Sequence, residues 1–140
     1  MVDRVLVLLL AVVAVVAVAL IARVALRART RRVLAAGPDF VWSSLEASPD
    51  GRRTIVAFSS PSCAACHTAQ FPALQRVEQQ VGEAAVRLIS VDVARRSSAA
   101  SAFGVLTVPS TAVLDAHGRV LAVNHGFTPS STLLQQLQLG

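Results

Sequence analysis

Two cysteines three positions apart are the residues of this chain best suited to chemistry. Cys63 and Cys66 enclose Ala64-Ala65, and the chain has no other cysteine. Two thiols at this spacing can close a small disulfide and reopen it, and a helix that starts at the first cysteine favours its thiolate through the helix amides and dipole. A separate structural disulfide framework and a four-cysteine zinc site are excluded by the cysteine count. The pair is therefore the candidate redox site, and no metal site is expected.

A strand and a helix must position this pair. The run Arg53 to Ser59 is short, β-branched and bounded by turn residues, which is typical of a strand buried on both faces of a sheet. A helix is predicted from about Cys63 to Val81, where Gly82 ends it. Pro72 lies inside this helix and should kink it, because proline lacks the backbone N–H. The cysteines thus lie where a strand leads into a helix.

The remaining elements predict the fold class. A short strand is possible at residues 40–42, followed by the capping pattern Ser43 to Glu46. The later elements are a strand at 86–93, a helix at 97–103, a hairpin of strands 111–114 and 120–124, and a helix at 130–139. Parallel strands joined by a helix and followed by a hairpin predict an α/β fold with a mixed sheet flanked by helices.

The beginning of the chain has the length and composition of a membrane span. The 18 residues from Val5 to Ala22 carry no charge, and the apolar stretch reaches Leu26 if Arg23 snorkels. At about 1.5 Å per residue this stretch spans roughly 27 to 33 Å, close to a bilayer core of about 30 Å. We predict a transmembrane helix at residues 5–26 after a short flank at 1–4. A signal peptide cleaved near Ala17-Val18-Ala19 is the alternative, but the apolar run is longer than a signal core and continues past that site.

The positive charge is concentrated beside this span. Residues 1–32 hold six arginines and one acid, whereas the rest of the chain holds seven arginines and seven acids. The folded part is therefore expected at 39–140 without a nucleic-acid partner, behind an arginine-rich juxtamembrane linker at 27–38. Arginines after the span favour a cytoplasmic position for the carboxyl side, next to anionic headgroups, in a single-pass protein of the cell membrane. An extracytoplasmic position stays open as the alternative.

Three stretches resemble the thioredoxin fold family. Phe58 to Cys66 is similar to the family's segment from strand to active site, and its Ser-Pro before the first cysteine is most similar to membrane-anchored TlpA-like disulfide reductases. Val91-Asp92-Val93 resembles the strand end before the short helix, and Phe103 to Ser110 resembles the cis-proline loop. The resemblance covers roughly residues 53–140, and it implies a thioredoxin-like mixed sheet with one transmembrane helix in front.

This resemblance implies roles for individual residues. Val108 and Pro109 would lie against the cysteine pair and bind the backbone of a partner protein as an added strand. Cys63, nearest the helix amides, would attack a partner disulfide, and Cys66 would resolve the mixed disulfide from a buried position. The expected function is that of a membrane-tethered thiol-disulfide oxidoreductase. It needs a protein disulfide substrate and an upstream thiol or membrane electron donor, but no cofactor.

Several residues depart from the family pattern. Ser62 stands where the family often has tryptophan, and Ala57 stands at the position of the buried acid of many thioredoxins. Without that acid, water or His67 must take the proton from Cys66, so His67 is a possible modulator. Pro72 follows the second cysteine one residue later than in the family.

Two other functions fit parts of the sequence. Cys63 to His67 has the form of a c-type haem attachment site with His67 as axial ligand, although the arginines disfavour the extracytoplasmic side where attachment occurs. Ala57 also permits a non-catalytic thioredoxin-like binding module at the membrane. Two reactive thiols argue against the binding module, and the strand and Val-Pro loop fit the redox fold better than a haem site.

Overall fold

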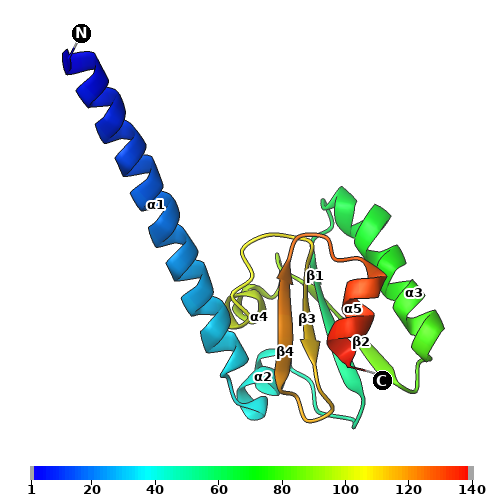
Figure 1. Ribbon diagram of the computed structural model, residues 1–140. Coiled ribbons are helices and arrows are strands. Elements are labelled where there is room, and N and C mark those ends of the chain that lie inside the picture. Colours follow the sequence, from blue (N-terminus) through cyan, green and yellow to red (C-terminus); the bar gives the residue numbers. More distant parts are fainter. Residues whose placement is uncertain (1, 139–140) are drawn as a thin grey trace.

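Within residues 2–138, which the computed structural model describes, a four-stranded mixed sheet forms the centre of the protein (Figure 1). Its order is β2-β1-β3-β4, with β1 at Arg53–Ser59, β2 at Val86–Asp92, β3 at Ser110–Leu114 and β4 at Val120–His125. β1 pairs in parallel with β2 and antiparallel with β3, and β3 and β4 form the expected hairpin. The predicted α/β fold with a mixed sheet is confirmed.

Helices cover both faces of this sheet. In Figure 1, α3 and α5 lie on one side, and α2, α4 and the end of α1 lie on the other. The helices are α1 at Val2–Leu34, α2 at Pro38–Ser44, α3 at Phe71–Val81, α4 at Ser97–Ala102 and α5 at Ser130–Leu137. The last helix was expected to reach Leu139, which lies outside the described residues.

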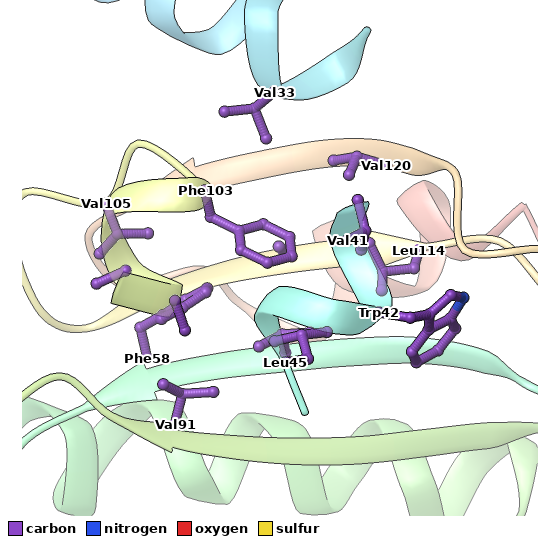
Figure 2. Packing of buried hydrophobic residues seen from close by; sticks show 14 residues of the cluster. Val33, Val41, Trp42, Leu45, Phe58, Val91, Phe103, Val105, Leu114 and Val120 are labelled. Carbon is purple, nitrogen blue, oxygen red and sulfur yellow. The ribbon is translucent and has the colours of Figure 1, made fainter. Parts of the chain in front are cut away.

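Alternate residues of β1 supply both layers of the core. Ile55 and Ala57 pack toward α3 and α5, whereas Val56 and Phe58 pack toward α2 and α4. Figure 2 shows the second layer, in which the rings of Phe58 and Phe103 lie with their centroids 5.4 Å apart. Burial on both faces explains why β1 is a continuous apolar run and shows no alternation with polar residues.

The segment before β1 differs from the prediction. Residues 40–42, expected as a short strand, lie inside α2, which starts at Pro38. Proline suits the first turn of a helix because that turn has no partner for its N–H groups. Val41 and Leu45 are both buried, and this i, i+4 spacing turns one helical face to the sheet. Helical packing therefore explains the apolar residues that suggested a strand.

α1 extends far from the folded domain (Figure 1). Its most apolar 18-residue window has a mean hydropathy of 3.4 and no buried residue, so it is a candidate membrane span by length and composition. The helix continues through the arginine-rich segment to Leu34, so residues 27–34 of the expected linker are helical. Only the last turns contact the domain, where Val33 is buried in the core layer of Figure 2.

Candidate active site

A disulfide joins Cys63 and Cys66 at the start of a helix. Their Cα atoms are 5.3 Å apart, and the helical residues begin at Ala64. The backbone N–H of Cys66 donates a hydrogen bond to Cys63 Sγ at 3.1 Å. Cys63 thus accepts a bond from the third helical residue, as a side chain at the N-cap position does. The same N–H would stabilise a Cys63 thiolate after reduction.

The two sulfurs differ in exposure. Cys66 is 1% exposed and belongs to the buried residues, whereas Cys63 is half-buried and reaches the surface. A partner can therefore approach Cys63 but not Cys66. The attacking role expected for Cys63 and the resolving role expected for Cys66 stay predictions.

Strand pairing brings two further segments to the cysteines. Ser59 at the end of β1 pairs with Asp92, and its carbonyl accepts a hydrogen bond from Val93 N–H at 2.9 Å. On the other side Phe58 pairs with Ser110, the residue after Pro109. The strand end that leads to Cys63 is therefore flanked by the end of β2 and by the loop before β3.

The loop before β3 is held in place by the chain after β4. The Val108–Pro109 peptide bond is cis, and the Pro109 carbonyl accepts a hydrogen bond from Gly126 N–H at 2.9 Å. Val108 is half-buried and lines an apolar cavity of about 170 Å³, together with Val93 and Leu106 among others. Of the two expected substrate-binding residues, Val108 thus lines a cavity, and Pro109 is held by Gly126.

One turn of the helix after the cysteines is wider than an α-turn. Residues Cys66–Gln70 form a π-helical turn, closed by a hydrogen bond from Phe71 N–H to the Cys66 carbonyl. The turn ends just before Pro72, where a kink was expected. A π-turn accommodates one extra residue within a helix. It therefore explains how the chain absorbs the additional residue between Cys66 and Pro72.

The π-turn places Gln70 in the interior, a role that sequence reasoning missed. Gln70 is 2% exposed, and its amide forms two hydrogen bonds with the backbone of Thr128. Gln70 Nε2 donates to the Thr128 carbonyl at 3.1 Å, and Thr128 N–H donates to Gln70 Oε1 at 2.9 Å. Thr128 follows Gly126, which binds Pro109, so Gln70 links the cysteine helix to the loop before β3. The extra residue before Pro72 was the available sequence signal.

Two other singled-out residues lie apart from the disulfide chemistry. Ala57 is buried among apolar residues of the α3 and α5 layer, including Leu74 and Leu133. His67 is exposed, with its ring centroid 5.4 Å from that of Phe71. In the described part of the chain no hydrogen bond joins His67 to either cysteine, and no group of three or more His, Cys, Asp or Glu side chains could hold a metal. His67 as a modulator stays a prediction.

A disulfide at a helix start, with one half-buried and one buried cysteine and a cis Val-Pro loop before the neighbouring strand, is typical of a thioredoxin-fold protein. The family model described as Thioredoxin matches residues 44–138, and the chain belongs to this family. The fold and the paired cysteines support a thiol-disulfide oxidoreductase in general. No curated protein sequence matches the chain significantly.

Solved structures show the same fold. Thioredoxin-2, described as a component of the malaria parasite protein secretion machinery, has 22% identity and a TM-score of 0.57, and the match covers 64% of this chain and 84% of that one. Oxidised mitochondrial thioredoxin 3 from Saccharomyces cerevisiae has 18% identity and a TM-score of 0.55, with 64% and 80% covered. Fasciola hepatica thioredoxin has 21% identity and a TM-score of 0.53, with 62% and 79% covered. At these identities the likeness shows the fold alone.

Proposed function

We propose that this protein is a membrane-tethered thiol-disulfide oxidoreductase that reduces or exchanges disulfides of a partner protein. The observation that carries the proposal is the Cys63–Cys66 disulfide itself, with an accessible first sulfur and a buried second one. A bond between these sulfurs is the oxidised form of a two-electron couple.

The reduced pair would act in two steps. The Cys63 thiolate attacks one sulfur of the partner disulfide, a Cys63–partner bond forms, and the other partner sulfur leaves as a thiolate. The Cys66 thiol then loses its proton and attacks Cys63 Sγ, which closes the Cys63–Cys66 bond and releases the second partner thiolate. Two electrons pass to the partner. An upstream thiol or a membrane electron donor must reduce the pair again.

Val108 and Pro109 would hold the partner during these steps. The Val108 side chain borders the apolar cavity near the end of β2, and the loop backbone lies beside the strand end that leads to Cys63. An extended partner segment could pair with this loop backbone and place an apolar side chain in the cavity. This role for the two residues rests on the family resemblance and on their position.

α1 would hold the domain at the membrane, as in TlpA-like reductases. The arginines after the apolar stretch favour the cytoplasmic side, where the surrounding thiols would keep the pair reduced and favour reductase activity. On the extracytoplasmic side the same domain would depend on a membrane reductant. In Figure 1 the carboxyl end of β1 points to the same side of the domain as the amino end of α1, so the partner disulfide would lie close to the membrane.

Cysteine variants of the full chain test the mechanism. Reduced protein in detergent is mixed with a peptide disulfide, and thiol release is followed over time. Cys63→Ser should lower release to the uncatalysed rate, because the accessible nucleophile is lost. Cys66→Ser should accumulate a mixed disulfide that runs as a larger species on a non-reducing gel. Ser60→Ala, a change at a half-buried serine near the pair, is the matched control and should keep the wild-type rate.

Ala57 favours a second candidate, a non-catalytic binding module, because no acid stands behind the pair to take a proton. The same assay separates the two functions. A wild-type chain that binds the peptide but releases no thiol above background would support the binding module. Full activity in both cysteine variants would contradict the exchange mechanism.

A further inference from the structure

A second cavity lies where α1 meets the domain. It has a volume of about 460 Å³ and is lined by Arg29 and Arg32 of α1, by Ser101 of α4 and by Val105 and Leu106 of the following loop, among others. α1 lies close to the loop after α4, because a Cβ on Gly104 would be in ordinary van der Waals contact with Val33 Cγ2 at 3.6 Å and with Arg29 Cβ at 3.8 Å. Arg29 and Arg32 therefore lie beside this loop.

The charge in this cavity is uncompensated. No acidic residue lines it, and across residues 2–138 neither Arg29 nor Arg32 forms an ion pair. Arg52, Arg87 and Arg96, in contrast, each contact a carboxylate. Arg29 and Arg32 are three positions apart on α1 and therefore on one face of the helix, and planar guanidinium donors suit phosphate oxygens.

Apolar surface adjoins these cations. Leu106 is 61% exposed and Phe40 is 53% exposed, and both line the cavity. A free inorganic anion would leave these side chains in water. A ligand that carries a phosphate and an apolar chain would cover both parts of the cavity.

The position along α1 matches the headgroup layer of a bilayer. With the apolar stretch ending at Leu26, Arg29 lies about 4.5 Å and Arg32 about 9 Å further along the helix axis. The headgroup layer extends roughly 5 to 7 Å beyond the hydrocarbon on each side, and long arginine side chains can reach back toward it. The cavity therefore lies at the depth of lipid phosphates.

We propose that this cavity binds the headgroup of an anionic phospholipid from the bilayer that α1 spans. This inference rests on the membrane tether of the proposed function. Arg29 and Arg32 donate hydrogen bonds to the lipid phosphate, and Leu106 and Phe40 contact the adjoining glycerol and upper acyl chain. Val105 and Leu106 also line the smaller cavity beside Val108, so the bound lipid holds the substrate-binding loop near the membrane surface.

Deuterium exchange of the full chain in lipid nanodiscs tests the proposal. Nanodiscs of phosphatidylcholine alone are compared with nanodiscs that also contain phosphatidylglycerol. We expect amide exchange in residues 101–106 to slow by roughly tenfold in the anionic discs. The double variant Arg29→Gln with Arg32→Gln should lose this protection. The matched control, Arg27→Gln with Arg31→Gln, removes the same charge from the same helix end but not from the cavity, and should keep it.

Three results would overturn the proposal. Equal exchange in both lipids would show that the cavity takes no anionic headgroup. If both double variants lose the protection of residues 101–106 equally, the arginines attract the helix end to the anionic bilayer surface without a defined site. The same protection from inorganic phosphate in phosphatidylcholine discs would assign the cavity to a free anion. Thiol release by the same samples is measured in parallel, so a failure of the lipid site is distinguished from a failure of the redox function.

Discussion

The surroundings of the two sulfurs differ, and this difference sets the order of the proposed chemistry. Cys63 sits at the start of the helix and accepts the Cys66 N–H, whereas Cys66 is buried under the helix. An amide that points at a sulfur stabilises the thiolate, and burial in apolar surroundings disfavours it. Cys63 should therefore be the more reactive thiol after reduction.

A charge beside the cysteines should slow exchange. Val108→Asp places a carboxylate at the apolar cavity next to the site, where it opposes the negative charge shared by three sulfurs in the transition state. We expect kcat/KM for a peptide disulfide to fall about tenfold, with a smaller fall at high salt. Val108→Thr, similar in shape and uncharged, is the control and should stay close to the wild type. Equal kcat/KM values for Val108→Asp and the wild type would show that Val108 is not part of the surface that binds the partner.

Removal of the buried Gln70 amide should destabilise the domain. Gln70→Ala leaves the Thr128 N–H and carbonyl buried without a partner, which costs about 1–3 kcal/mol of unfolding free energy. Urea unfolding measures the loss. Gln79→Ala removes an exposed glutamine from the same helix and should change the stability little. If both variants lose a similar free energy of unfolding, the two hydrogen bonds between Gln70 and Thr128 do not stabilise the domain as expected.

Among the secondary-structure elements, the turn between β3 and β4 is packed tightly on α2. Asp115 Oδ1 accepts the N–H groups of His117 and Arg119, each at 2.9 Å, which closes the turn. Gly118 has a φ of +88°, and a Cβ there would overlap the indole of Trp42. The turn thus needs glycine both for its backbone conformation and for its contact with the helix.

Two glycine variants separate these requirements. Gly118→Ala adds left-handed strain and a clash with Trp42. Gly51→Ala adds strain alone, because Gly51 has a φ of +86° and no atom within 4 Å of its Cβ position. We expect Gly51→Ala to cost about 1–2 kcal/mol and Gly118→Ala about 2 kcal/mol more, as measured by denaturant unfolding. An equal loss of unfolding free energy in Gly51→Ala and Gly118→Ala would show that α2 can move away from the turn without destabilising the domain.

For the molecule as a whole, the relation of α1 to the redox site matters most. α1 contacts the domain only near its carboxyl end, and its amino end projects on the side to which β1 carries the chain toward Cys63 (Figure 1). A bilayer around the apolar part of α1 would lie over that side. The tether would then restrict the partners to proteins whose disulfides lie at the membrane surface.

The location of the chain can be measured in cells. We expect the protein to stay in the membrane fraction after alkaline extraction and to keep its residues before Ala22, because the apolar stretch is long enough to span a bilayer. A membrane-impermeant maleimide, applied after reduction, should label Cys63 only in lysed cells. Labelling in intact cells would place the domain outside the cytoplasm. A shortened chain in the soluble fraction would show that the apolar stretch is a cleaved signal.

Local patterns were sufficient for much of the fold. The β-branched run at 53–59, the helix that ends at Gly82 and the hairpin after Ser110 follow from side-chain periodicity and turn residues. The spacing of Cys63 and Cys66 likewise indicated redox chemistry without any knowledge of the tertiary structure. These features depend on residues close in sequence, so their physical causes can be recognised in a single chain.

Contacts between distant segments required the tertiary structure. Gln70 and Thr128 are 58 positions apart, and only the packing of the cysteine helix against the loop before α5 joins them. Residues 40–42 are β-branched and aromatic, but burial of one helical face against the sheet outweighs their strand preference. The cavity at Arg29 and Arg32 likewise exists because α1 continues as a helix to Leu34 and meets α4 there. Local propensity could not show these features, because each depends on which surfaces meet after folding.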